Sequence, residues 1–217
     1  MKTYHAKISS KVVVRRRIAA AIVLTLVVAV IVLLTLLLKA SPRNSDPEYL
    51  HEVQIPNWIS VQYIDMDAGN ARNGALLEEI NGIVVHYVAN PGTSAERNRS
   101  YFNNKGTTVF AHFIVGLEGE IIQCAPLYER SAASNNRNID TISIEVCHPD
   151  ESGIFTQPTY DALVRLCAWL SAECNFKQDD IIRHYDVTGK LCPKYFVEHE
   201  DAWKQFKTAV MKEKKQF

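Results

Sequence analysis

A long apolar run near the N-terminus constrains the fold of this chain more than any other feature. It extends from Ile18 to Leu38, 21 residues without a charged side chain, and Thr25 and Thr35 are its only polar members. About 20 apolar residues in a helix are needed to cross the ~30 Å hydrocarbon core of a bilayer. A helix that is apolar on every face lies in a membrane or deep inside a large protein, and 217 residues suit one medium domain with an appendage. We therefore expect residues 18–38 to form a transmembrane helix.

The charges around this run predict its orientation. Six basic residues precede it: Lys2, Lys7, Lys11, Arg15, Arg16 and Arg17. Only Lys39 and Arg43 follow it closely. The positive-inside rule then places residues 1–17 in the cytoplasm and the C-terminal domain outside the cell. A cleaved signal peptide is the competing interpretation, but its apolar region spans ~7–15 residues and ends at a site of the A-x-A type. A single-pass anchor in the cell membrane is therefore favoured over secretion.

The remainder of the chain is expected to contain a linker and one folded domain. Residues 39–57 carry three prolines among charged residues, which predicts a stalk, and residues 58–217 follow as the domain. Residues 1–43 hold eight of the 24 basic residues and no acidic one, so the remaining chain has 16 basic and 24 acidic residues, a net charge of −8. Nucleic-acid binding needs a basic surface, so no nucleic-acid partner is expected.

Local patterns in the domain predict a mixture of strands and helices. Short apolar runs predict strands at residues 83–88, 113–117, 121–124 and 141–147. The middle two runs flank Glu118-Gly119, which predicts a β-hairpin. Apolar residues at helical spacing, with Ser94 as an N-cap, predict helices at residues 94–103, 156–174 and about 198–212. Together these elements predict an α/β domain with a mixed central β-sheet flanked by helices.

Side chains within the stretch HYDVTGKLC predict a metal site. His184, Lys190 and Cys192 lie in these nine residues, and the glycine and proline around them indicate a loop that can fold all three toward one point. Zinc accepts imidazole nitrogen and thiolate sulfur in a tetrahedral set, and a catalytic zinc keeps one position for water. A third protein ligand is then needed, and His86 in the apolar run GIVVHYV could supply it. The alternative is that His184 and Cys192 are ordinary core residues.

Four segments in fixed order extend this pattern. NGIVVHYVANPGTSAERNRSYF, AHFIVGLEGEIIQCAP, DTISIEVCHPD and IIRHYDVTGKLCPKYF follow one another across roughly residues 81–196. The chain here resembles the zinc-dependent N-acetylmuramoyl-L-alanine amidases, the type 2 amidase family that includes phage lysozyme-type amidases and animal peptidoglycan recognition proteins. The resemblance implies a mixed sheet with helices, Zn²⁺ as cofactor and peptidoglycan or muropeptides as substrate. The family's metal ligands fall on His86, His184 and Cys192.

Two further residues are candidates for catalysis. Glu145 in TISIEVC is a carboxylate at the end of an apolar strand, where burial is costly without a partner or a task. The resemblance implies that Glu145 faces the zinc-bound water as the acid–base group, and that Lys190 stabilises the oxyanion. The plainer interpretations are a surface residue at a strand end for Glu145 and a solvated loop cation for Lys190.

The sequence departs from the phage-type members at one position. Those members carry a tyrosine that assists catalysis just before the histidine of the HF strand, and here that position is Ala111, followed by His112. The tyrosine's role is therefore absent or is taken over by Glu145. His112 could line the substrate cleft or be a core histidine, and His148 could border the cleft or lie in a surface loop. Asn90 begins a turn after His86 that could contact the peptide or be a plain turn.

Four cysteines remain if Cys192 binds the metal: Cys124, Cys147, Cys167 and Cys174. Cys167 and Cys174 lie seven residues apart on a predicted helix, roughly 10 Å along its axis. That separation is too great for a disulfide between them, so small buried hydrophobic residues are the favoured interpretation. A pairing of either one with Cys124 or Cys147 remains open.

The resemblance thus implies a zinc enzyme that hydrolyses the amide bond between N-acetylmuramic acid and L-alanine, whereas spacing and composition by themselves indicate only a metal hydrolase that faces outward. The alternative is a non-catalytic, membrane-anchored peptidoglycan-binding module. Such binders in the resembling family typically lose the cysteine ligand, whereas this chain keeps Cys192 together with Glu145 and Lys190. These three residues favour the enzyme.

Overall fold

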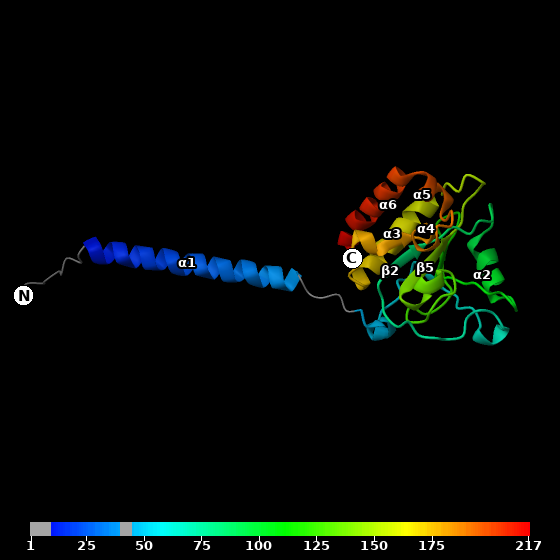
Figure 1. Ribbon diagram of the computed structural model, residues 1–217, viewed down its shortest axis with the longest axis horizontal. Coiled ribbons are helices and arrows are strands. Elements are labelled where there is room, and N and C mark those ends of the chain that lie inside the picture. The colour runs from blue at the N-terminus through cyan, green and yellow to red at the C-terminus, as the bar shows by residue number, and fades with distance from the viewer. Residues whose placement is uncertain (1–9, 40–44) are drawn as a thin grey trace, which may run out of the picture. The chain divides into compact units, whose positions relative to one another are not determined.

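The computed structural model describes residues 10–39 and 45–217. The chain separates into two units, residues 1–43 and 44–217 (Figure 1). The first contains α1 (Ser10–Lys39), a single helix, and the second contains every strand and all other helices of the described residues. Residues 1–9 of the expected cytoplasmic segment and residues 40–44 of the expected stalk lie outside the described residues.

Helix α1 includes the run that was expected to cross a membrane. It is 30 residues long. Among the residues that the structure describes, no helix combines the length and apolarity required of a membrane span. The structure therefore does not confirm the expected transmembrane helix.

A six-stranded mixed sheet forms the centre of the second unit, as the sequence predicted. Its strands lie in the order β1-β4-β3-β5-β2-β6. Their bounds are β1 (Ser60–Val61), β2 (Gly82–Val85), β3 (Phe113–Val115), β4 (Ile121–Gln123), β5 (Thr141–Val146) and β6 (Ile181–Arg183). Only the β3–β4 pair is antiparallel, and the other neighbours are parallel. The carboxyl ends of β2, β5 and β6 therefore meet at one edge of the sheet.

The antiparallel pair is the predicted hairpin. Its turn contains Gly119 with φ +86°, a left-handed conformation that glycine adopts without steric cost. A Cβ atom at this position would lie 2.8 Å from the carbonyl oxygen of Pro158. Glycine is thus required for two reasons: the left-handed conformation of the turn and the close approach of the Pro158 backbone.

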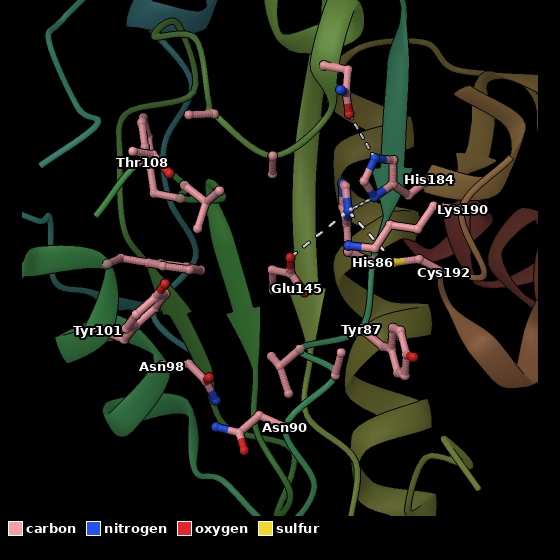
Figure 2. Close-up of a pocket in the computed structure, with 18 of the residues that line it drawn as sticks. His86, Tyr87, Asn90, Asn98, Tyr101, Thr108, Glu145, His184, Lys190 and Cys192 are labelled. Atoms are coloured by element: carbon pink, nitrogen blue, oxygen red, sulfur yellow. Dashed lines mark hydrogen bonds and ion pairs between the residues drawn. The ribbon is translucent and has the colours of Figure 1, made fainter. Parts of the chain in front are cut away.

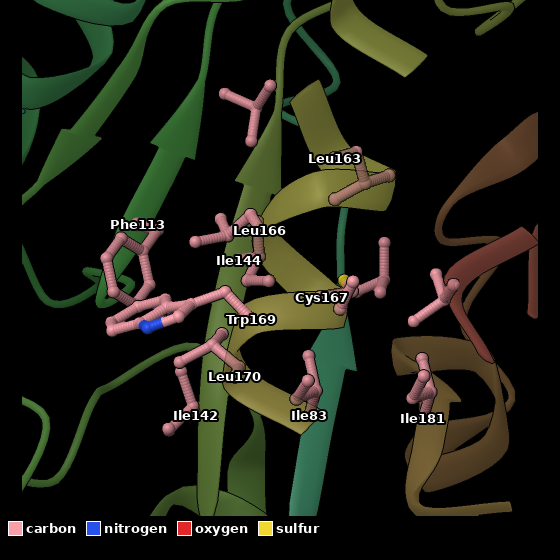
Figure 3. Packing of buried hydrophobic residues seen from close by; sticks show 14 of the residues in the cluster. Ile83, Phe113, Ile142, Ile144, Leu163, Leu166, Cys167, Trp169, Leu170 and Ile181 are labelled. Carbon is pink, nitrogen blue, oxygen red and sulfur yellow. The ribbon is translucent and has the colours of Figure 1, made fainter. Parts of the chain in front are cut away.

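Helices α3 (Gln157–Glu173) and α6 (Glu200–Glu213) cover one face of the sheet (Figure 1). Figure 3 shows Leu166, Trp169 and Leu170 of α3 beside Ile142 and Ile144 of β5. Full burial of each such side chain contributes roughly 1.5–3 kcal/mol to stability. Both helices were predicted, and each begins and ends within about two residues of the expected bounds.

Helix α2 (Ala95–Asn103) covers the opposite face. Ser94 accepts a hydrogen bond from the backbone amide of Arg97, as expected of an N-cap. Side chains alternate between the two faces of a strand, so Ile142 and Ile144 point toward α3 while Ser143 and Glu145 point the other way. By the same alternation, His86 lies on the side of α2 (Figure 2).

The folded domain begins earlier than residue 58, the expected boundary. A 3₁₀ helix at Pro47–His51 buries Leu50, and Val53 and Ile55 pack against the same core. The backbone amide of Ile80 also donates to the carbonyl of Ser45. The described part of the expected stalk is therefore part of the domain, because its spaced apolar residues bury against the core despite the prolines and charges around them.

The stretch HYDVTGKLC is also less irregular than expected. It begins with α4 (His184–Thr188), a short helix directly after β6, followed later by α5 (Lys194–Glu198). Gly189 ends α4 in a left-handed conformation with φ +75°. Glycine here terminates a helix instead of preventing one, and the chain then returns past Lys190 to Cys192.

Candidate functional site

Two histidines meet where neighbouring parallel strands end. His86 follows β2, and His184 follows β6 as the first residue of α4. Strands β2 and β6 pair with Val85 opposite Arg183, so the next residue of each strand lies beside its counterpart. The backbone amide of Tyr185 donates to the carbonyl of Cys192 at 2.9 Å, which folds the loop after α4 back against the start of that helix.

These elements bring His86, His184 and Cys192 into one buried cluster (Figure 2). One possible ligand atom from each residue lies within 4.8 Å of the other two. The Nδ1 atoms of the histidines are 3.1 Å apart, and the Cys192 Sγ is 4.0 Å from the His86 Nδ1. Two imidazole nitrogens and one sulfur at this spacing could hold a metal ion.

The protonation states of the histidines suit a metal. Burial lowers the pKa of His86 well below its usual value, and His184 and Lys190 lower it further. Burial and Lys190 also lower the pKa of His184. Both rings are therefore neutral at pH 7, the form that binds a metal. Two nitrogen lone pairs that face one another across 3.1 Å are disfavoured unless a proton or a cation lies between them. The donor set of two nitrogens and a sulfur fits zinc.

Cys192 is held as a thiol by its surroundings. Burial raises the pKa of Cys192 to about 12, and the charge of Glu145 acts in the same direction. The backbone amide of Tyr87 and the Lys190 ammonium lower this pKa. Metal binding to Cys192 would therefore release a proton.

Glu145 lies beside the cluster, and one of its carboxyl oxygens has no hydrogen-bond partner among the described residues. Its side chain is 18% exposed, and Oε1 is 4.0 Å from the His86 Nδ1. Oε2 has no hydrogen-bond partner among the described residues. Burial raises the pKa of Glu145 to about 8, and the Lys190 ammonium opposes this shift. The carboxyl is therefore poised to exchange a proton near neutral pH.

Lys190 is an exposed cation at the same site. Its charge lowers the pKa of His86, His184 and Glu145. Figure 2 shows it next to His184 and Cys192. Lys190 can therefore supply a positive charge to an anion that forms in front of the cluster.

An open cleft of about 1060 Å³ connects this cluster to α2. Its far wall includes Arg97, Asn98 and Tyr101 of α2 and the segment 108–110, and Figure 2 shows Asn98, Tyr101 and Thr108 across from Glu145. No sequence motif indicated this wall. The helical pattern predicted α2 itself, but the local sequence does not indicate which part of the sheet α2 covers. Asn90, left open between contact and turn, also lines the cleft.

The structure shows where His112 and His148 lie, the two histidines for which both a cleft position and a structural role were open. His112 is fully buried, donates from Nε2 to the Glu129 carbonyl at 2.8 Å and accepts at Nδ1 from the Ser143 amide at 3.0 Å. His148 is also buried, bonds through Nδ1 to the Asp150 carbonyl and lies against the Tyr87 ring. Neither lines the cleft. Their positions agree with structural roles and not with substrate contact.

All five cysteines are buried, and none of them is in a disulfide. The possible disulfides of Cys124 or Cys147 with Cys167 or Cys174 are therefore not formed. Cys167 and Cys174 are buried in the hydrophobic core, as the favoured interpretation held.

The fold and the cluster together define an α/β protein whose sheet edge carries a site that could hold a metal ion at one end of a cleft. Residues 76–195 match the family model described as N-acetylmuramoyl-L-alanine amidase. The chain belongs to this family, which confirms the resemblance seen in the sequence.

Relatives with known names support this placement. The chain is 32% identical over 162 residues to the N-acetylmuramoyl-L-alanine amidase BlyA of Bacillus subtilis, a match that covers 64% of this chain and 43% of BlyA. It is 30% identical over 180 residues to the amidase XlyB of the same species, covering 79% of this chain and 49% of XlyB. The chain thus spans less than half the length of either relative.

A solved structure shows the same architecture. The catalytic domain of XlyA, an amidase of Bacillus subtilis, has a TM-score of 0.61 and 28% sequence identity to this chain. The likeness covers 70% of this chain and 98% of the XlyA domain. The mixed α/β sheet predicted from the sequence is therefore that of a type 2 amidase.

Proposed function

We propose that this protein is a zinc-dependent N-acetylmuramoyl-L-alanine amidase, which hydrolyses the bond between N-acetylmuramic acid and L-alanine in peptidoglycan or muropeptides. The observation that carries the proposal is the buried cluster of His86, His184 and Cys192 with Glu145 beside it. Oε1 of Glu145 lies 4.0 Å from Nδ1 of His86, and Oε2 has no hydrogen-bond partner among the described residues. Family membership supports the choice of substrate.

The three cluster residues would hold Zn²⁺. When bound, zinc supplies Lewis-acid chemistry, in the form of a water of lowered pKa and a polarised carbonyl. A cation at this place would also lower the pKa of Glu145, in the same direction as Lys190. Glu145 would then be ionised at neutral pH and able to accept a proton.

Glu145 acts as the general base and then as the general acid. Its Oε2 atom has no competing hydrogen bond among the described residues, so it is free to accept a proton from the attacking water. Cleavage of the amide requires a proton on the leaving nitrogen, because an amide anion is a poor leaving group. The protonated Glu145 delivers it. No tyrosine is needed at the position of Ala111, which is fully buried.

Lys190 stabilises the negative charge that develops on the carbonyl oxygen. Its ammonium already acts on Glu145 and on both histidines, so it lies close enough to act on an oxyanion between them. A positioned donor of this kind contributes about 10²–10³ in rate. The cleft toward α2 offers room for the peptide and sugar on either side of the bond.

Digestion of purified peptidoglycan tests this proposal. The full-length chain, solubilised in detergent and loaded with zinc, should release peptides that begin with L-alanine and leave intact N-acetylmuramic acid, as identified by mass spectrometry. The Cys192→Ser variant should contain much less zinc by elemental analysis, because a hydroxyl is a far poorer zinc ligand than a thiolate. Binding to peptidoglycan without release of peptides by the zinc-loaded wild type would instead identify a binding module.

A further inference from the structure

One loop contacts the outer nitrogen of both cluster histidines. The Ser134 hydroxyl lies 3.0 Å from Nε2 of His86, and Oδ1 of Asn135 lies 3.0 Å from Nε2 of His184. Ser134 and Asn135 are consecutive, whereas the two histidines they contact are 98 residues apart in the chain. Neither the predicted strands nor the sequence motifs indicated this loop.

The backbone of the loop is fixed in the conformation that these contacts need. Asn135 has φ +55°, in the left-handed region, which asparagine tolerates better than most residues. Oδ1 of Asn138 accepts from the backbone amides of Ala133 at 3.0 Å and Ser134 at 2.7 Å. Ser134 itself is fully buried. The loop therefore presents the hydroxyl and the amide oxygen from a constrained backbone.

The Asn135 contact selects one tautomer of His184, and the Ser134 contact is compatible with the same tautomer of His86. An amide oxygen can only accept, so Nε2 of His184 must donate and carry the hydrogen. The Ser134 hydroxyl can rotate to accept from Nε2 of His86 in the same way. Each neutral ring then keeps its lone pair on Nδ1, and the two Nδ1 atoms are the ones that face each other at 3.1 Å. The opposite tautomer would place a hydrogen where a metal must bind.

We propose that Ser134 and Asn135 are positioning residues that orient the rings of His86 and His184 for metal binding, and that Asn135 also fixes the tautomer of His184. The inference rests on the proposed zinc site and adds the residues that prepare it. Loss of such an outer hydrogen bond typically weakens metal affinity 10–100-fold.

A pair of substitutions at Asn135 separates the hydrogen bond from the backbone conformation. Asn135→Gly tolerates the positive φ but removes the acceptor, whereas Asn135→Asp keeps an acceptor oxygen at the same place. Ser134→Ala removes the other acceptor. Asn136→Ala is the matched control, because Asn136 is an exposed residue of the same turn. Thermal unfolding checks that each variant is folded. If Ser134→Ala does not fold, the variants at Asn135 still test the proposal, because Asn135 is exposed.

Two measurements on the full-length chain in detergent test the proposal. Zinc affinity, from competition with a chelator, should fall 10–100-fold in Ser134→Ala and Asn135→Gly and stay close to wild type in Asn135→Asp and Asn136→Ala. Long-range ¹⁵N–¹H spectra of the metal-free chain should show the Nε2–H tautomer of His184 in wild type and in Asn135→Asp. Asn135→Gly should show increased Nδ1–H tautomer.

The outcomes separate this inference from the proposed function. Unchanged affinity in both Ser134→Ala and Asn135→Gly would overturn the inference while the zinc site stands. Weaker affinity without a tautomer change would also overturn it, because the loop would then act through packing alone. A wild type that binds no zinc would refute the proposed metal, and the tautomer spectra of the metal-free chain would still decide whether the loop orients the rings.

Discussion

Glu145 is a partly buried carboxyl whose Oε2 atom is buried and has no hydrogen-bond partner among the described residues. A group in this position lowers the stability of the fold, because its charged form is desolvated and its neutral form lacks a partner. Burial raises its pKa to about 8 for this reason. A side chain that destabilises the fold and has no evident structural role is a candidate for a catalytic function.

Substitution of Glu145 should therefore separate catalysis from metal binding. Glu145→Gln preserves the shape of the side chain but cannot accept the proton, so amidase activity should fall by about 10²–10⁴. Zinc content should remain that of wild type, because Glu145 is not part of the cluster. Peptide release from peptidoglycan and elemental analysis on the same sample provide both readouts. Full activity with normal zinc would show that Glu145 has no acid–base role.

His112 illustrates the opposite case, a buried histidine with a structural role. Its two ring nitrogens join the start of β3 to Ser143 of β5 and to the segment at Glu129. Burial lowers its pKa to about 4 in the folded protein. In the unfolded chain a histidine titrates near 6.5.

This pKa difference predicts an acid-sensitive contribution to stability. The unfolded chain takes up the proton first as the pH falls, so the contribution of His112 is complete above about pH 6.5 and is lost between pH 6.5 and 4. From pH 7.5 to 5 the loss should be about 2 kcal/mol. Urea unfolding at both pH values measures it. His112→Asn keeps an acceptor for the Ser143 amide and does not titrate, so its loss over the same interval should be smaller by that amount. Equal pH dependence of the two proteins would refute the assignment.

At the scale of elements, the β3–β4 hairpin depends on Gly119 for two separate reasons. Its φ is +86°, and a Cβ atom would lie 2.8 Å from the Pro158 carbonyl oxygen. Gly106 shares the first property, with φ +82°, but a Cβ there would meet nothing within 4 Å. The two glycines thus form a natural pair for comparison.

Alanine substitution at each glycine should separate backbone strain from steric overlap. Gly106→Ala should cost about 1 kcal/mol from the left-handed backbone alone, whereas Gly119→Ala should cost about 1–3 kcal/mol more because α3 must shift away from the hairpin. Urea unfolding of both variants at pH 7.5 gives the comparison. Equal destabilisation would mean that α3 accommodates the methyl group freely.

Elements with a strong local signal could be predicted from the sequence. The run GIVVHYV gives β2, TISIEVC gives β5, and the helical spacing after Thr156 gives α3. Each is long enough, or apolar enough, for its pattern to outweigh its surroundings. The metal cluster could be proposed as well, because His184 and Cys192 are close in the chain and His86 ends a predicted strand.

Elements that depend on distant partners could not be predicted. Strand β1 is two residues long and exists only because it pairs with β4. Ser134 and Asn135 lie at the start of a short 3₁₀ helix, Asn135–Ile139. Their contacts with the histidines follow from the order of β5, β2 and β6 in the sheet. The local sequence around Leu50 predicts a proline-containing stalk, and only the tertiary structure shows the core that buries this residue. Local pattern carries no information on such long-range contacts.

At the scale of the whole molecule, charge is distributed unevenly. Residues 44–217 have a net charge of −8, yet the cleft of this acidic domain is lined by the cations Arg97 and Lys190 and only one carboxylate, Glu145. A cleft concentrates the field of the charges that line it. The cleft therefore attracts anionic groups more strongly than the rest of this acidic domain does.

The location of the protein remains a prediction from the sequence, and it determines which substrate the cleft can meet. Six basic residues precede the apolar run 18–38, and the chain after it is acidic, so the positive-inside rule places the domain outside the cell. The full-length protein should then sediment with membranes, and protease added to intact, wall-stripped cells should degrade the domain while a cytosolic protein stays protected. Protection of the domain would reverse the orientation. A soluble product that begins near Ser41 would show a cleaved signal peptide, and in that case the zinc chemistry would act on peptidoglycan away from the membrane.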